Sequence, residues 1–140
     1  MSCPPSSATL LLAATLLLTP PLLSCARNPV TGKSEISLVS ESQEIQMGKE
    51  ASQQTIQSIG LVNDPSLQAY VSAIGKRMAA ASERPNLPWE FHVADDASVN
   101  AFALPGGFIF VTRGLLTYIN NEAELATVVG HEIGHVTNRH

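Results

Sequence analysis

The feature that most constrains this chain is a short polar run near its end, His131-Glu132-Ile133-Gly134-His135. The run lies in a segment from Asn121 onward, where cap residues and an acidic first turn predict a helix. Two histidines four residues apart differ by about 40° around such a helix and by about 6 Å along it. Their imidazoles can therefore converge on one ion from a single turn.

The H-E-x-x-H pattern indicates a metal site built for hydrolysis. Zinc binds imidazole nitrogens such as those of His131 and His135, and it tolerates a tetrahedral site in which water takes one position. Glu132 then lies beside that water and can accept its proton as a general base. The alternative is an ordinary helix with two solvated histidines. Gly130 and Gly134 favour the metal site, because each glycine costs about 1 kcal/mol in a helix interior and needs a packing reason.

A tetrahedral zinc site needs a third protein ligand, and two nearby residues fail the geometry. His140 faces about 180° away from His131 for as long as the helix persists. Glu124 lies on the same face as His131 but about 10.5 Å below it. Neither residue completes the site from this helix.

The N-terminal segment differs in composition from the rest of the chain. None of the 8 Lys and Arg or 12 Asp and Glu residues lies before Arg27. Residues 8–23 form an apolar run broken by Pro20 and Pro21, shorter than the roughly 20 residues of a membrane-spanning helix. The run fits the apolar region of an export signal, although only the terminal amine supplies positive charge. The alternative, a buried helix of the domain, lacks support because the run has no amphipathic period.

The apolar run ends in the sequence L-L-S-C, which resembles a bacterial lipobox with Cys25 as the modified residue. Residues 1–24 are thus predicted to be a lipoprotein signal peptide, and residues 25–40 a tether behind the lipid anchor. Ala26 favours the outer membrane, so we expect a lipid-anchored protein on the periplasmic side of a bacterial cell envelope. A free or disulfide-bonded cysteine is the alternative, but cleavage would remove Cys3, the only other cysteine.

The remaining residues, 41–140, suffice for one modest domain. The chain has a formal net charge of −4 and no Lys or Arg cluster, which argues against nucleic-acid binding. A capping box at Ser40 predicts a helix over residues 41–58, and Asp64-Pro65 starts a second helix through about Ala81. The predicted inward-facing residues are Ile45, Ala51, Ile56 and Ile59 in the first helix, and Leu67, Tyr70, Val71, Ile74 and Met78 in the second.

Strands are predicted between these helices and the last one. Residues 89–93 alternate in polarity, with His92 facing solvent as a surface histidine rather than a metal ligand. Asp95-Asp96 is read as a turn cap. Residues 99–104 and 108–112 flank a Pro-Gly-Gly turn and predict a hairpin, followed by a short helix through Leu115 and Leu116.

Several segments together match one known family. They are Asn28–Gly32, Ser37–Ser40, Asn100–Gly107, Asn121–Leu125 and the run from His131 to His140. In these segments the chain resembles the family-forty-eight zinc metallopeptidases, the group that contains HtpX, Oma-type and CAAX-prenyl endopeptidases. The resemblance is closest to the bacterial periplasmic lipoprotein members.

The resemblance implies an α+β, zincin-like fold of the gluzincin type, truncated after the active-site helix. It implies one Zn²⁺ bound by His131 and His135, with Glu132 as the general base. The third ligand, a glutamate on a later helix, is then expected beyond residue 140. On this interpretation the chain is an N-terminal fragment, and residues 41–140 are the N-terminal part of a metallopeptidase domain.

The resemblance also concerns the predicted hairpin. It implies that Asn100, Ala101, Phe102 and Ala103 form an edge strand on which an extended polypeptide substrate docks by β-augmentation. An ordinary hairpin without a binding role is the alternative for this segment.

The leading hypothesis is a membrane-anchored zinc metalloendopeptidase that hydrolyses envelope proteins in protein quality control. The alternative is a non-catalytic, chaperone-like or binding lipoprotein with an incomplete zinc site. A serine hydrolase is unsupported, because no G-x-S-x-G sequence occurs.

Overall fold

The computed structural model describes residues 26–27, 34–35 and 39–139 of the chain. The predicted signal peptide, the predicted lipidation site Cys25, and His140 all lie outside the described residues. Two short strands in the predicted tether, β1 (Ala26–Arg27) and β2 (Ser34–Glu35), pair antiparallel. The domain that follows consists of α1 (Glu41–Ile59), α2 (Pro65–Ala79), β3 (Glu90–Ala94), β4 (Ala101–Leu104), β5 (Phe108–Thr112), α3 (Arg113–Leu116) and α4 (Glu122–Asn138).

The helices begin where local hydrogen bonds satisfy their free backbone donors. Ser40 and Gln43 form the predicted capping box, in which each side chain bonds the other residue's backbone N–H. Asp64 accepts bonds from two backbone N–H groups at the start of α2, with Pro65 as the first helical residue. Asn121 caps α4 in the same way. The three predicted helix starts are therefore confirmed.

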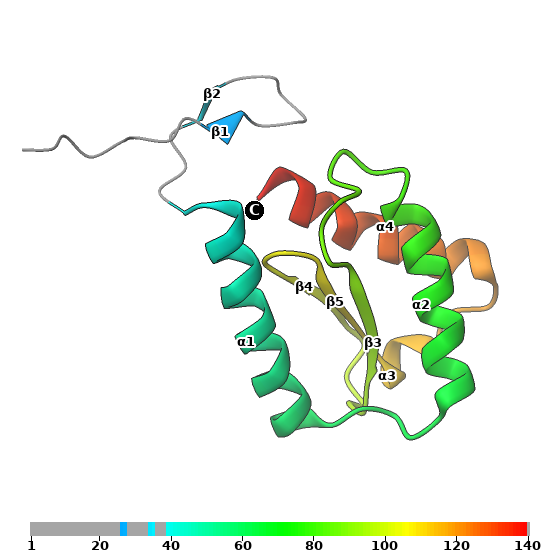
Figure 1. Ribbon diagram of the computed structural model, residues 1–140. Coiled ribbons are helices and arrows are strands. Elements are labelled where there is room, and N and C mark those ends of the chain that lie inside the picture. The colour runs from blue at the N-terminus through cyan, green and yellow to red at the C-terminus, as the bar shows by residue number, and fades with distance from the viewer. Residues whose placement is uncertain (1–25, 28–33, 36–38, 140) are drawn as a thin grey trace, which may run out of the picture.

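The sheet has the order β3-β5-β4, so β5 is central and β4 is an edge strand (Figure 1). β4 and β5 form the predicted antiparallel hairpin, and Gly106 and Gly107 take the positive φ angles that their turn requires. β3 and β5 run parallel. After β3 the chain crosses to the far edge of the sheet, where β4 runs in the opposite direction, and the hairpin then returns the chain as β5 between them.

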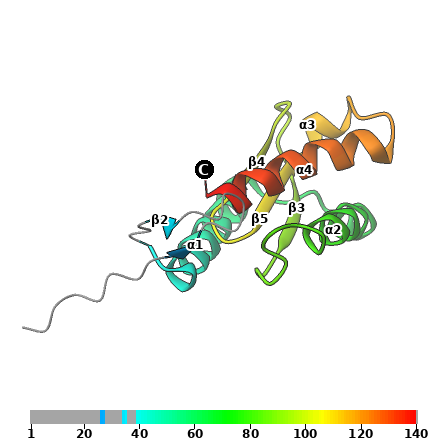
Figure 2. The same ribbon diagram turned by 90° about the horizontal axis from the view of Figure 1, so that it is seen from above.

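Helices cover both faces of this sheet (Figures 1 and 2). α1 lies over one face, where Phe108 and Phe110 of β5 pack with Ile56. α2 and α4 lie over the other face, where Ile109 and Val111 of β5 join the larger core. Because β5 is buried on both faces, its first four residues are all apolar rather than alternating, and only the last, Thr112, is polar. The result is an α+β domain with α4 beside the edge strand.

Three predicted side-chain placements are wrong in detail. Ile59 is 38% exposed because it is the last residue of α1, whereas the fully buried positions of that helix are Gly48 and Ser52. Tyr70 is 47% exposed and its hydroxyl bonds Glu122 instead of entering the core. The His92 side chain is only 20% exposed, because its ring lies against Phe110, although its Nε2 atom still lies 3.2 Å from Glu90 at the surface. The buried Gly48 matters for the site, since any Cβ there would collide with the Pro105 carbonyl.

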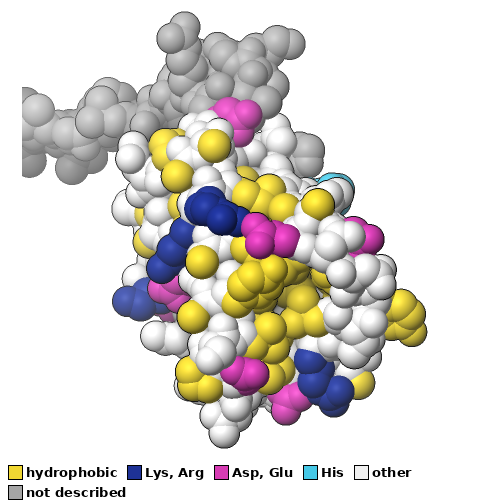
Figure 3. All heavy atoms as spheres, turned by 90° about the vertical axis from the view of Figure 1, so that its right-hand side faces the viewer, with side chains coloured by type: hydrophobic (Ala, Val, Ile, Leu, Met, Phe, Trp, Pro, Cys, Tyr) yellow, Lys and Arg dark blue, Asp and Glu magenta, His cyan; other side chains and the backbone are white. Residues whose placement is uncertain are grey.

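Figure 3 views the molecule from the side of α2 and the start of α4, where hydrophobic side chains gather between charged ones. A hollow of about 270 Å³ lies there, lined by residues of α2, α4 and the segment between α3 and α4. The Arg77–Glu122 ion pair links α2 to α4 beside it. Among the described residues, none of the helices combines the length and apolar character needed to cross a membrane.

Candidate metal centre

The two motif histidines meet on one turn of α4. Their Nε2 atoms lie 3.0 Å apart, and their rings are nearly perpendicular with centroids 4.6 Å apart. His131 is exposed and His135 is half-buried, so the pair opens to solvent on one side. The imidazoles converge as the i, i+4 spacing requires.

This geometry fits a zinc ion. Two nitrogens bound to one tetrahedral zinc at about 2.0–2.1 Å each are separated by roughly 3.4 Å. The observed 3.0 Å between the Nε2 atoms is close to that value, so a small rotation of either ring suffices. In the part of the chain that the structure describes, no group of three His, Cys, Asp or Glu side chains is placed so that it could hold a metal ion. The described residues thus offer two nitrogen ligands.

Glu132 follows the first histidine and is largely enclosed. It is 8% exposed, and its carboxylate makes no hydrogen bond or ion pair with any described residue. The other enclosed carboxylate of the domain, Glu44, is fully engaged by Arg84. Among the described residues no buried side-chain oxygen lacks a hydrogen-bond partner, so the Glu132 carboxylate oxygens reach solvent at this site. A carboxylate without a protein partner retains its acceptor capacity for a water or a ligand.

The edge strand β4 presents open backbone groups beside α4. Thr112 N–H donates to the Asn100 carbonyl, so these two residues form a hydrogen-bonded pair. Bonding alternates along an antiparallel ladder, so the polar groups of Phe102 and Leu104 also face β5. Those of Ala101 and Ala103 therefore face the open edge. The strand begins at Ala101, so Asn100, the first residue of the predicted substrate-binding segment, lies just before it.

The Phe102 side chain has a different position from its alanine neighbours. Its ring stacks on Phe110 with centroids 5.1 Å apart, on the face that α1 covers. Ala101 and Ala103 lie against the other core, on the α4 side. Phe102 thus fixes the strand in the sheet, while the two alanines bring the edge close to α4.

Three acidic residues that the sequence analysis did not take as metal ligands, Glu124, Asp95 and Asp96, make contacts of other kinds. Glu124 accepts hydrogen bonds from Asn120 and Asn121 at the start of α4. The backbone N–H of Asn120 is the main cause that lowers the pKa of Glu124. Asp96 accepts a bond from the Ser98 backbone in the predicted turn, while Asp95 pairs with Arg113.

A buried ion cluster, which sequence patterns did not indicate, holds the C-terminal end of α4. Arg84 is 7% exposed and bonds both carboxylate oxygens of Glu44, at 2.8 and 3.0 Å. The same guanidinium reaches Glu41 and donates to the Val136 carbonyl at 3.1 Å. Glu44 also accepts from the Gly106 backbone N–H. The cluster therefore ties α1 and the β4–β5 turn to the residue after His135.

Glu44 should make the domain sensitive to acid. Burial raises its pKa, but hydrogen bonds from Arg84 and Gly106 and the charge of Arg84 outweigh burial and leave the pKa lowered. A carboxylate with a lowered pKa stabilises the fold above its ordinary value of 4.5. That contribution disappears as the pH falls through the lowered value.

We therefore expect the free energy of unfolding to decrease below about pH 4.5, and this acid dependence to be weaker in Glu44→Gln. Urea unfolding of both proteins from pH 7 to about pH 3 measures the difference. The variant should lose most stability relative to the parent at neutral pH and least at the acid end. Parallel curves at all pH values would contradict this role for Glu44.

One family model and several known proteins match this chain. The model of peptidase family M48 matches residues 65–140, which include β3–β5 and the whole of α4. This chain belongs to peptidase family M48. The predicted family is thereby confirmed, and the observed α+β domain is consistent with it.

Relatives come from bacteria and from mitochondria. The chain is 38% identical over 112 residues to the beta-barrel assembly-enhancing protease of Escherichia coli (strain K12), which covers 80% of this chain and 23% of that protein. The Yersinia pestis protein of the same name is 36% identical over 139 residues, a match that covers 92% of this chain and 29% of that protein. The mitochondrial metalloendopeptidase OMA1 of Schizosaccharomyces pombe is 36% identical over 115 residues, a match that covers 80% of this chain and 34% of that protein. The M48 chain thus spans only about a quarter to a third of these relatives.

Proposed function

We propose that this chain supplies the zinc-binding helix and the substrate strand of a zinc metalloendopeptidase. The observation that carries the proposal is the convergence of His131 and His135, with the unpartnered Glu132 between them in sequence, beside the open edge of β4. Membership of peptidase family M48 supports it, as do relatives named as metalloendopeptidases.

In this proposal the fold is zincin-like, and the Nε2 atoms of His131 and His135 would hold one Zn²⁺. A third ligand comes from outside the described residues. When bound, zinc would polarise the scissile carbonyl and lower the pKa of a water. Glu132 accepts the proton of the attacking water on its carboxylate and then donates it to the leaving amine.

The β4 edge binds the substrate backbone. The open N–H and C=O groups of Ala101 and Ala103 pair with an extended polypeptide, as a further strand would. Asn100 and Phe102 belong to the same segment, with their backbone groups bonded toward β5. Because α4 packs beside β4, a peptide on this edge passes the two histidines.

We also propose a location for the activity. Cys25 would carry the lipid anchor and residues 25–40 would tether the domain to the outer membrane, facing the periplasm. Envelope proteins, damaged or misassembled, would be the substrates in protein quality control. The bacterial relatives, named for β-barrel assembly, support an envelope role.

The open edge of β4 also favours a second candidate, a non-catalytic chaperone-like or binding lipoprotein. Such a protein would hold a polypeptide on the same strand without cleaving it. The two candidates share the substrate strand and differ in what Glu132 does.

Digestion of casein by the full-length, zinc-loaded protein tests the enzyme. We expect digestion to stop with a chelator and to return with added zinc. Ala103→Pro removes one open N–H group and should lower kcat/KM roughly fivefold, the value of one hydrogen bond. Ala103→Ser keeps that N–H and should be close to the parent. Digestion that ignores chelators, or equal rates in the two variants, would contradict the proposal.

A further inference from the structure

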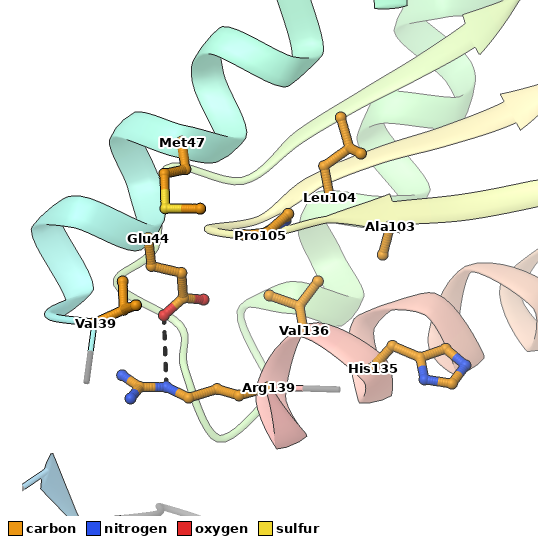
Figure 4. Close-up of a pocket in the computed structure, with 9 residues that line it drawn as sticks. All are labelled: Val39, Glu44, Met47, Ala103, Leu104, Pro105, His135, Val136 and Arg139. Atoms are coloured by element: carbon orange, nitrogen blue, oxygen red, sulfur yellow. Dashed lines mark ion pairs between the residues drawn. The ribbon is translucent and has the colours of Figure 1, made fainter. Parts of the chain in front are cut away.

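A cavity of about 310 Å³ opens at the end of β4 where the strand turns toward β5 (Figure 4). It lies between α1 and the last turn of α4. Its walls include Met47 of α1, Leu104 and Pro105 of the β4–β5 hairpin, and Val136 of α4. The volume lies within the usual range for a site that encloses a small ligand group.

The cavity is continuous with the proposed substrate strand and the histidine pair. Ala103 lines it, and the backbone groups of Ala103 face the open edge. His135 lines it as well, while its Nε2 atom points to His131. In Figure 4 the His135 imidazole is directed away from the Glu44–Arg139 pair at the other end. Strand residues advance about 3.3 Å each, so a peptide paired with Ala103 passes from the histidines to the cavity within a few residues.

The chemistry of the walls favours an apolar occupant. Met47 is 56% exposed, and its flexible thioether can adapt to side chains of different shapes. The two charged residues of the cavity neutralise each other, since Arg139 Nε lies 3.5 Å from Glu44 Oε2. Glu44 is held by Arg84 in addition. A charged substrate side chain would therefore lose its hydration in the cavity without gaining an unpaired ion of opposite charge, whereas an apolar side chain would contact the apolar walls.

We infer that this cavity is a specificity pocket, which receives one large apolar side chain, such as that of Leu, Met or Phe, from the polypeptide bound along β4. The inference rests on the proposed function, because it assumes that a substrate follows this edge. It adds a substrate class to that function: extended segments with a large apolar residue a short distance from the cleaved bond.

Peptide binding and cleavage test the pocket separately. Zinc-loaded, full-length Glu132→Gln is titrated with labelled peptides in which each position in turn carries Leu or Ser, and the parent is assayed for cleavage of the same set. We expect one position at which Leu is preferred over Ser by on the order of tenfold, in binding and in kcat/KM.

Variants of Met47 connect this preference with the cavity. Met47→Asp places a charge at the pocket and should reduce the preference to less than about threefold, while Met47→Ala enlarges the pocket and should shift it from Leu toward Phe. Gln53→Asp, an exposed residue of the same helix outside the cavity, should keep the tenfold preference. A preference that is absent in the parent, or unchanged in Met47→Asp, overturns the pocket even if chelator-sensitive cleavage is present. If the parent cleaves none of the peptides, the proposed endopeptidase activity is wrong. The preference for Leu over Ser in the binding titration would still show whether the pocket receives an apolar side chain.

Discussion

Glu132→Gln is expected to abolish proteolysis while the protein keeps its zinc. The amide has nearly the same shape as the carboxylate but cannot accept a proton from water at neutral pH. General-base catalysis contributes about 10²- to 10⁴-fold, so kcat should fall by about that factor. The Glu132 carboxylate has no partner among the described residues, so its replacement should leave the fold intact. Proteolysis, zinc content and urea unfolding of the variant are measured together.

A matched control separates this effect from a general loss of negative charge. Glu83 is exposed and lies outside the motif, so Glu83→Gln should digest casein at the parental rate. Unchanged proteolysis in Glu132→Gln would exclude the general-base role. If the parent binds polypeptides without cleaving them, and Glu132→Gln binds them equally well, the chaperone-like alternative would be favoured instead.

Arg84→Met is expected to cause the largest loss of stability. It removes the cation that bonds both carboxylate oxygens of Glu44, whose side chain is only 12% exposed, and leaves that carboxylate with the longer contact to Arg139 at 3.5 Å. Breaking a buried ion pair by removing one partner costs about 3–5 kcal/mol. The Val136 carbonyl also loses the Arg84 donor and keeps only the backbone N–H of Arg139 among the described residues, so the end of α4 that carries His135 should become less ordered. Urea unfolding measures the loss.

The control for Arg84→Met is an exposed pair in the same domain. Arg77 and Glu122 join α2 to α4 with side chains 69% and 49% exposed. Exposed pairs contribute about 0–1 kcal/mol, so Arg77→Met should have a small effect. Equal losses in the two variants would mean that burial of the Arg84 cluster does not matter.

The helices and the hairpin could be predicted because their signals are local. Ser40, Asp64 and Asn121 bond backbone groups two or three residues away, so the sequence pattern contains both partners. The Pro-Gly-Gly turn likewise depends on backbone angles at adjacent residues. The convergence of His131 and His135 follows from the helix repeat alone.

The remaining features depend on contacts between distant segments. Arg84 meets Glu44 across 40 residues of sequence and Val136 across 52, and neither pairing leaves a periodic pattern. The specificity pocket has the same origin, because its walls come from α1, β4 and α4. The helical spacing of Tyr70 predicts a core position, but Glu122 from another helix accepts a hydrogen bond from its hydroxyl at the surface.

Zinc binding by the purified full-length protein tests the central claim most directly. Metal analysis should find one zinc ion per chain, and the double variant His131→Ala, His135→Ala should lose it. His92→Ala is the matched control and should keep its zinc, because His92 lies against Phe110 on the face that α1 covers. A parent protein that purifies without zinc and does not take it up, or a double variant that retains it, would contradict the account.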